Sequence, residues 1–153
     1  MLCFRRDYSA KHLAQHPRQT TKSILLAFQQ GFIDIVVTPR QGAPKTISAG
    51  CDWSQNAGID TSGHKMIAAF NKPGGFDCMV VVGSSAEERG YGLIDPAPDA
   101  QSLTLYLRSP IGAVSGGPDN AKDVDLTLGP QDRTFVLKRI DAKDCESFKA
   151  IVK

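Results

Sequence analysis

Four cysteines offer the clearest chemistry in this sequence. Cys3, Cys51, Cys78 and Cys145 are widely spaced, and no two form the Cys-x-x-Cys pair typical of thioredoxin-like sites and zinc ribbons. An even number of dispersed cysteines in a loop-rich chain predicts two disulfides and an oxidising compartment. Of the three connectivities, we favour Cys51 with Cys78 and Cys3 with Cys145, because the second bridge would tie both chain ends to the domain. The alternative is four reduced, buried thiols in a cytosolic protein.

Two histidines four residues apart are the candidate metal ligands. His12 and His16 fall in a short predicted helix, where this spacing can direct two imidazoles toward one ion. A third ligand, such as His64 or Cys3, would have to be supplied by the fold, and the glutamate of a His-Glu-x-x-His motif is missing. We therefore expect no cofactor and treat the two histidines as partly exposed side chains.

The charges are nearly balanced but unevenly distributed. The chain holds 18 basic and 16 acidic residues, a formal net charge of +2, which is too small to indicate a nucleic-acid partner. Residues 1–50 contain seven Lys or Arg against two acids, whereas residues 51–100 contain three against seven. We interpret this as an ordinary mixture of solvated faces that attract each other. The alternative is a basic recognition surface that includes Arg5, Arg6, Lys11 and Arg18.

No catalytic motif is complete in the sequence. Ser115 to Pro118 resembles part of the nucleophile motif of chymotrypsin-like proteases, but Val114 stands where that family has aspartate, and we expect a loop. Asp123 and Asp125 are predicted opposite the leucine face of a strand, which favours a solvated surface over a glycosidase acid/base pair. The P-loop, the dinucleotide fingerprint and the Gly-x-Ser-x-Gly elbow are absent.

The single tryptophan and two glycine-rich segments each allow two interpretations. Trp53 lies two residues after Cys51, and we favour a core indole packed on a disulfide over an exposed anchor for a ligand. The segments 73–76 and 112–117 are either recognition loops at one end of the fold or simple connections.

Short strands must position these residues. Apolar alternation and β-branched residues predict the following strands: 20–30, 32–38, 65–70, 76–82, 90–94, 102–108, 123–128 and 134–140. The first two would form a hairpin around Gly31, with a helix over 20–30 as the rival, and 76–82 is predicted to be buried on both faces. Short helices are predicted within 7–16 and 141–148. Residues 39–63 are predicted as turns around one short strand, and 109–118 as a loop.

The spacing of these elements predicts a mainly β fold. Strands separated by roughly 8 to 15 residues, with Gly/Pro punctuation and no long amphipathic helix, indicate one β-rich domain over residues 1–153. We expect an antiparallel β-sandwich or barrel with one or two short helices near the termini.

The apolar runs fall far short of the ~18 residues of a membrane span. Because no secretory leader is visible at Met1, we expect a mature segment that lacks its leader.

These patterns favour a small secreted or periplasmic binding module that is not an enzyme, such as an inhibitor or an envelope-associated protein. Its partner would be a protein or an envelope component, with no nucleic acid and no membrane span. The alternative is a small hydrolase whose acid/base residues, drawn from His12, His16, His64 and the aspartates, assemble only in the fold.

Overall fold

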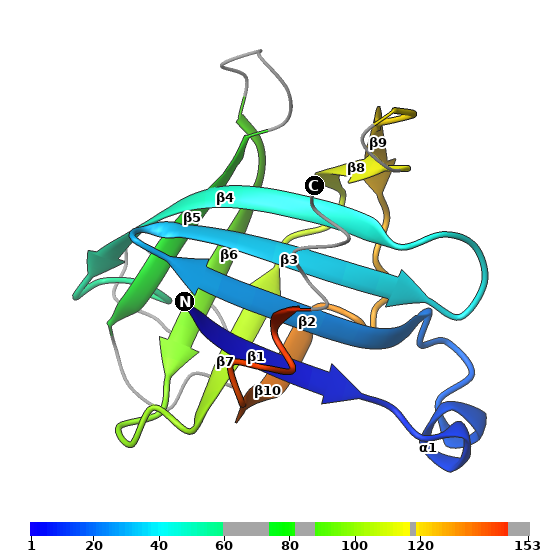
Figure 1. The fold of residues 1–153 in the computed structure, drawn as a ribbon, viewed down its shortest axis with the longest axis horizontal. Helices are drawn as coiled ribbons and strands as arrows, with labels where there is room; N and C mark the ends of the chain where they lie inside the picture. Colours follow the sequence, from blue (N-terminus) through cyan, green and yellow to red (C-terminus); the bar gives the residue numbers. More distant parts are fainter. Residues whose placement is uncertain (60–73, 82–87, 117–118, 147–153) are drawn as a thin grey trace.

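The computed structural model describes residues 1–59, 74–81, 88–116 and 119–146 (Figure 1). Its strands are β1 (Leu2–Asp7), β2 (Thr21–Gln29), β3 (Phe32–Pro39), β4 (Lys45–Ser54), β5 (Gly75–Val81), β6 (Glu88–Pro96), β7 (Ser102–Leu107), β8 (Ile111–Ser115), β9 (Lys122–Leu126) and β10 (Thr134–Ile140). One helix, α1 (Ala10–Gln15), is present in this described part. The predicted mainly β class is therefore confirmed.

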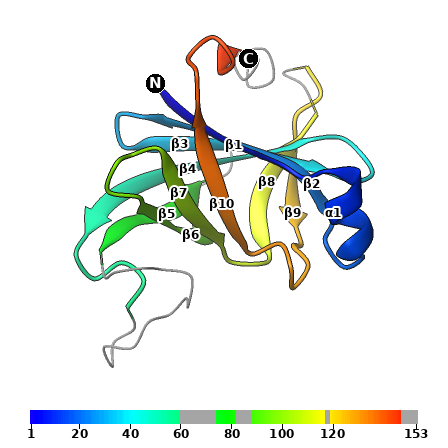
Figure 2. The same cartoon turned by 90° about the horizontal axis from the view of Figure 1, so that it is seen from below.

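The strands form one antiparallel sheet that closes on itself. Its order is β3-β2-β1-β10-β7-β6-β5-β4-β8-β9. An additional pairing of β3 with β4 joins the first and the eighth strand of this order, so the eight strands from β3 to β4 form a closed barrel. The hairpin β8–β9 extends from the start of β4, where Lys45 and Thr46 pair with Ser115 and Val114. Figure 2 shows β10 crossing the barrel between β1 and β7. Of the two predicted architectures, the structure has the barrel.

The hairpin of β2 and β3 forms as predicted, and the rival helix does not. Gln30 and Gly31 have φ angles of 42° and 83°, the left-handed conformations that a two-residue hairpin turn needs. Glycine adopts this conformation without steric cost, and the strands continue from Gln29 paired with Phe32.

The interior of the barrel is filled with side chains. Alternate residues of each strand point inward, and an eight-stranded barrel is just wide enough for such side chains to pack against each other. The buried core consists of Phe4, Ile24, Leu26, Ile33, Ile35, Val37, Ile47, Ala49, Cys51, Cys78, Val80, Ile94, Leu103, Leu105, Leu107, Ile111, Ala113, Leu128, Phe135 and Leu137. Tyr8, Phe28 and Phe76 pack against this core and are partly exposed.

Both predicted disulfides are confirmed. Cys51 and Cys78 face each other across β4 and β5 inside the barrel. Cys3 and Cys145 lie outside it, in a small apolar cluster that fastens the segment after β10 onto β1 and its neighbours. In the loop-closure description, sequence separations of 142 and 27 residues correspond to about 5 and about 3.5 kcal/mol of stabilisation.

Strand β4 corrects the prediction of turns around one short strand for residues 39–63. It runs for ten residues and is the longest strand described. Its small residues are typical of loops, but Ile47, Ala49 and Cys51 alternate inward as in any barrel strand. Backbone pairing with β3 along its first half and with β5 along its second half holds this strand.

Strand β8 corrects the prediction of a loop for residues 109–118. Ile111 and Ala113 are buried in the barrel core, which holds the strand in place. A Cβ atom on Gly90 of β6 would lie 2.5 Å from Ile111 Cγ1, so this approach requires a glycine. The strand depends on a contact distant in sequence, which local composition does not contain.

Strand β5 is not buried on both faces, contrary to the prediction for residues 76–82. Cys78 and Val80 are buried, whereas Asp77 and Met79 are half-exposed, because a barrel strand has one inward face.

The predicted strand 65–70 lies outside the described residues. For the predicted helix 141–148, the structure describes turns over residues 142–145 and helical conformation at Glu146, and 147–148 lie outside the described part. No helix among the described residues has the length and hydropathy required to cross a membrane.

Alkylation of the unfolded chain tests the disulfides. We expect iodoacetamide to add no label in denaturant without reductant and four labels after reduction, because both bridges are intact. Intact-mass measurement reads the number of labels, and peptide mapping without reduction should join Cys3 to Cys145 and Cys51 to Cys78. Any label before reduction, or another pairing in the map, would contradict the structure.

Candidate functional site

Helix α1 lies between β1 and β2 in the chain, at one end of the barrel that is here called the α1 end. Ser9 caps the helix, because its backbone is extended and its side chain accepts a hydrogen bond of 3.1 Å from the His12 backbone N–H. Leu13 is the buried residue of the helix, and the chain leaves the helical conformation at His16, just before Pro17. The helix predicted within residues 7–16 is thus confirmed.

A stack of planar side chains holds α1 against the barrel. The Arg6 guanidinium lies 5.2 Å from the centre of the Tyr8 ring, and Tyr8 lies 4.8 Å from His12. His12 and His16 then stack with ring centres 4.1 Å apart. Burial raises the pKa of the Tyr8 hydroxyl, and Arg6 partly opposes that rise.

The two predicted metal ligands, His12 and His16, lie side by side, but each uses one ring nitrogen in a hydrogen bond. His16 Nδ1 donates to the His12 carbonyl over 2.8 Å, because a carbonyl oxygen can only accept. Gln19 donates its Nε2 to Thr21, so its Oε1 accepts from His12 Nε2 over 2.9 Å. In the described part of the chain, no group of three His, Cys, Asp or Glu residues is placed to hold a metal ion. His64, named for both the metal and the hydrolase hypotheses, lies outside the described residues.

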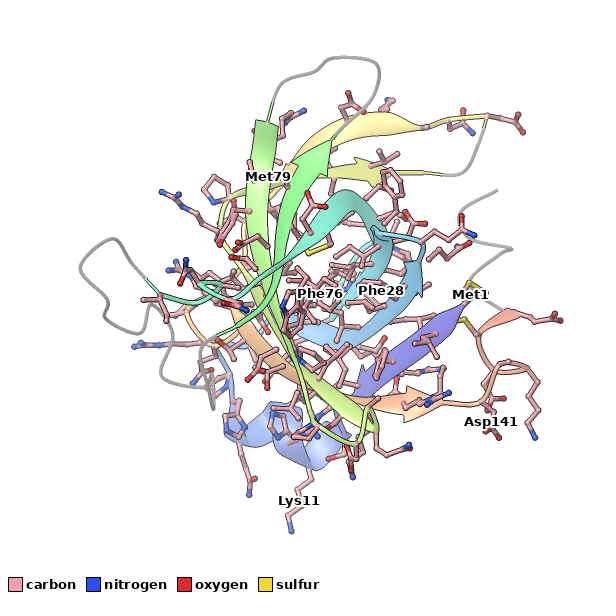
Figure 3. All side chains as sticks on the ribbon, turned by 90° about the vertical axis from the view of Figure 1, so that its left-hand side faces the viewer. Met1, Lys11, Phe28, Phe76, Met79 and Asp141 are labelled. Carbon is pink, nitrogen blue, oxygen red and sulfur yellow. A yellow bond between two sulfur atoms is a disulfide. The ribbon has the colours of Figure 1, made fainter. Side chains whose placement is uncertain are left out.

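The four predicted basic residues do not share one face. Arg5 and Arg6 are consecutive in β1 and so point to opposite sides of the strand. Arg5 pairs with Asp7 at 2.8 Å, whereas Arg6 covers Tyr8. Lys11 projects from α1 into solvent (Figure 3), and Arg18 is exposed on the turn that follows.

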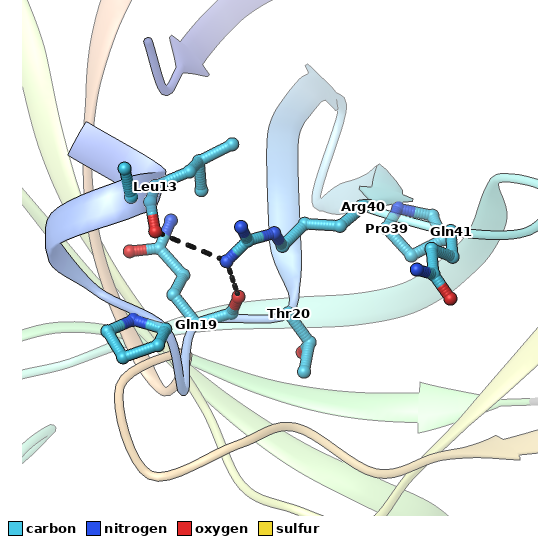
Figure 4. Close-up of a pocket in the computed structure, with 8 residues that line it drawn as sticks. Leu13, Gln19, Thr20, Pro39, Arg40 and Gln41 are labelled. Atoms are coloured by element: carbon cyan, nitrogen blue, oxygen red, sulfur yellow. Dashed lines mark hydrogen bonds between the residues drawn. The ribbon is translucent and has the colours of Figure 1, made fainter. Parts of the chain in front are cut away.

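A pocket of about 480 Å³ lies between α1, the turn after it and the end of β3 (Figure 4). We call it the α1 pocket. Its lining residues are Leu13, Ala14, Pro17, Gln19, Thr20, Pro39, Arg40 and Gln41. None of these was singled out in the sequence, because they come from two separate segments and match no motif.

Arg40 is the charged residue of the α1 pocket. Its backbone N–H donates to Thr20, and its Nη1 donates to the carbonyl oxygens of Leu13 and Gln19 at 3.3 and 3.2 Å. The Leu13 carbonyl, in the last turn of α1, also accepts from the His16 backbone N–H at 3.2 Å. Within the described residues, Arg40 makes no ion pair, and its Nε and Nη2 have no hydrogen-bond partner.

A buried carboxylate holds the same turn from the other side. Asp132 Oδ2 accepts hydrogen bonds from the Thr20 N–H (2.5 Å), the Thr20 hydroxyl (2.6 Å) and the Thr21 N–H (3.2 Å). Asp132 is fully buried, and its Oδ1 has no hydrogen-bond partner among the described residues. Arg40 and Asp132 together fix the position of Thr20.

Aromatic side chains gather at the opposite end of the barrel, here called the aromatic end. Trp53 is 54% exposed and packs edge-on against Phe76 at 5.2 Å, and Phe28 lies 5.0 Å from Phe76. Figure 3 shows Phe28 and Phe76 side by side. The prediction of a core tryptophan is therefore wrong, because β4 carries Trp53 beyond the filled interior, where Phe76 covers one edge of it.

The two glycine-rich segments do not lie together. Gly75 and Phe76 begin β5 and pair with the last residues of β4, whereas Val114 and Ser115 pair with its first residues. The nine residue steps of β4 separate these points by about 30 Å. Ser115 ends strand β8 instead of lying in a loop, and Gly117 and Pro118 lie outside the described residues.

The described acidic side chains are mostly solvated or hydrogen-bonded. Asp123 and Asp125 are exposed, as predicted, and Asp125 pairs with Arg89. On the outside of β5, Asp77 accepts a hydrogen bond of 2.5 Å from the Tyr91 hydroxyl. Burial, followed by this hydrogen bond, raises the pKa of Tyr91 well above its usual value.

Removing the Asp132 carboxylate should destabilise the fold. In Asp132→Ala, the Thr20 and Thr21 N–H groups lose their acceptor, and we expect a loss of about 2 to 4 kcal/mol in the free energy of unfolding. Asp99→Ala is the matched control, since exposed Asp99 accepts one backbone hydrogen bond, and it should cost less than about 1 kcal/mol. Urea unfolding measures both. Equal losses would show that Asp132 does not hold the α1 end.

The raised pKa of Tyr91 predicts a loss of stability in alkali. The hydroxyl ionises near pH 10.0 in the unfolded chain but only at higher pH in the folded one. Its contribution to stability is therefore complete below pH 10 and is lost as the pH rises further. In urea unfolding across this range, Tyr91→Phe should weaken the decline. A decline as steep as that of the wild type would contradict the assignment.

No protein-family model, curated protein or solved structure matches this chain. The α1 pocket combines an apolar wall with one guanidinium whose Nε and Nη2 face no partner within the described residues.

Proposed function

We propose that this protein is a binding module of the periplasm or the extracellular space, that it is not an enzyme, and that it binds a protein or another envelope component through the α1 pocket. The observation that carries this proposal is Arg40, a positive charge fixed at the pocket with donors that no described residue uses. A guanidinium in such a position is suited to recognising a ligand.

The composition of the pocket supports binding. Leu13, Pro17 and Pro39 supply apolar surface, while Gln19, Gln41 and Arg40 supply polar groups. A mainly apolar wall with a few polar groups is typical of ligand sites. The hydroxyl of Thr20, which lines the pocket, donates to the buried Asp132 side chain, and this hydrogen bond helps to order the turn.

The charge around the pocket favours an acidic ligand. Residues 1–50 contain only two acids, and neither faces the pocket as a free carboxylate. Asp7 pairs with Arg5, and Asp34 accepts a hydrogen bond from Ser48 on the outside of β3 and β4. Lys11 and Arg18 are exposed on the same helix and turn that build the pocket. Their positive field would attract an anionic partner.

The disulfides support the proposed compartment. Two disulfides are consistent with an oxidising environment, of which the periplasm and the extracellular space are the common examples. They also stabilise the barrel that carries the loops at its ends.

Site-specific photo-crosslinking tests the proposed function. A benzophenone side chain replaces one of two exposed glutamines: Gln15 beside the pocket, or Gln101 in the turn between β6 and β7 at the aromatic end. The full oxidised chain is irradiated with the envelope fraction of its source cells. We expect a discrete adduct from position 15 and none of the same mass from position 101, measured by gel mobility and mass spectrometry.

A pocket-filling variant makes the crosslinking result specific. Ala14→Trp places an indole in the α1 pocket and should abolish the adduct from position 15 without unfolding the barrel, because Ala14 is exposed. Circular dichroism checks the fold. An adduct that persists in Ala14→Trp, or that forms equally from position 101, would refute binding through the pocket.

A further inference from the structure

We propose that the α1 pocket receives a carboxylate carried on an apolar group, with the two carboxylate oxygens paired to Arg40 Nε and Nη2. This inference rests on the proposed function and names the chemical class of its ligand. It depends on which guanidinium donors are occupied, on the charge of the pocket and on the character of its wall.

The occupied donors leave one side of the guanidinium without a partner among the described residues. Nη1 has two hydrogens and meets two carbonyls, those of Leu13 and Gln19, so its donors are both used. Nε and Nη2 each keep a hydrogen on the same side of the planar group. Figure 4 shows these two nitrogens turned away from the two carbonyls. Parallel N–H donors in this arrangement match the two oxygens of a carboxylate.

The two carbonyl contacts also prepare Arg40 for binding. A free arginine loses considerable side-chain freedom when it pairs with a ligand, which weakens the net interaction. Here the hydrogen bonds to Leu13 and Gln19 already restrict that freedom. If Arg40 served only to cap the last turn of α1, Nη1 alone would be sufficient for that purpose.

The charge of the pocket favours a single negative charge. Arg40 is the one charged residue in the described lining, and Asp132 lies buried behind Thr20, which itself lines the pocket. A carboxylate is neutralised by one guanidinium. A phosphate dianion would carry one negative charge more than Arg40 neutralises, and this charge would lie close to the Asp132 carboxyl group. The balance therefore selects a carboxylate over a phosphate.

The lining of the pocket indicates which kind of chemical group is attached to the carboxylate. Leu13, Ala14, Pro17 and Pro39 present apolar surface, and a volume of about 480 Å³ is in the range of small-molecule sites. An aliphatic group attached to the carboxylate would cover this surface while the charge meets Arg40. Both a free organic acid and the carboxyl end of a protein chain have this chemistry.

Titration of the oxidised full chain with small acids and their neutral amides tests the ligand class. The probes are hexanoate and hexanamide for a free acid, N-acetyl-leucine and N-acetyl-leucinamide for a chain end, and inorganic phosphate. Shifts of backbone amide resonances and of the Arg40 Nε–H in ¹⁵N-correlated NMR spectra report binding. We expect each acid to bind at least about tenfold more tightly than its amide, and phosphate to bind more weakly than hexanoate, because charged hydrogen bonds dominate.

The relative affinity of the two acids identifies the source of the carboxylate. N-acetyl-leucine binding more tightly than hexanoate supports a protein chain end, and the reverse order supports a free acid. Equal binding of acid and amide, or tighter binding of phosphate, would overturn the carboxylate assignment.

Variants of Arg40 separate direct contact from the general field. Arg40→Gln should weaken acid binding about tenfold and leave amide binding unchanged, and Arg40→Lys should restore little because lysine lacks the paired donors. Arg18→Gln removes the same charge outside the lining and should change acid affinity less than about twofold. Equal effects of Arg18→Gln and Arg40→Gln would refute a direct contact.

The Ala14→Trp variant separates failure of the ligand class from failure of the proposed function. Loss of both acid and amide binding in this variant supports the pocket as the site. If acids and amides bind equally but Ala14→Trp abolishes both, the pocket stands and the carboxylate assignment fails. If Ala14→Trp leaves acid binding intact, or if no probe shifts a resonance of the lining residues, the carboxylate assignment to this pocket fails. The proposed function fails only if the crosslinked adduct is absent from position 15 or persists in Ala14→Trp.

Discussion

The backbone pairing of β3 with β4 is the constraint on which the rest of the structure depends. Without it, the sheet would have one edge at β3, exposing unpaired N–H and C=O groups. Closure removes that edge and turns one face of eight strands into an interior, which core side chains fill. Because apolar side chains occupy the interior, the pocket formed by the described residues lies outside it, on the helix and loops that the barrel supports.

At the α1 end, two opposite charges hold one turn without neutralising each other. Asp132 Oδ2 accepts from N–H and O–H donors of Thr20 and Thr21, whereas Arg40 is held by carbonyls of Leu13 and Gln19. Because each charge uses neutral partners, the turn becomes ordered while the guanidinium keeps its charge. A direct salt bridge between the two residues would order the same turn but would consume the donors that make the pocket suitable for an anion.

The sequence predicted the features that are local or covalent, and missed those that depend on contacts between distant segments. The Ser9 cap, the Gly31 turn and the alternation of residues 102–107 and 134–140 are local signals, and the cysteine spacing favoured the observed pairs. Strands β4 and β8 were missed because their small residues are typical of loops. Pairing with β3 and β5 holds β4, and the burial of Ile111 and Ala113, with Ile111 packed on Gly90, holds β8. The α1 pocket has no sequence signal, since Arg40 and Leu13 are 27 residues apart and Asp132 is 112 residues from Thr20.

The two ends of the barrel are stabilised in different ways, and this bears on where binding can occur. Cys3 lies near the start of β1 and Cys51 near the end of β4, so both disulfides lie toward the aromatic end. The α1 end is held by hydrogen bonds and by the stack from Arg6 to His16. The hydrogen bonds to Leu13 and Gln19 hold Arg40 and its turn in position before a ligand binds. The disulfides stabilise the barrel that carries this end.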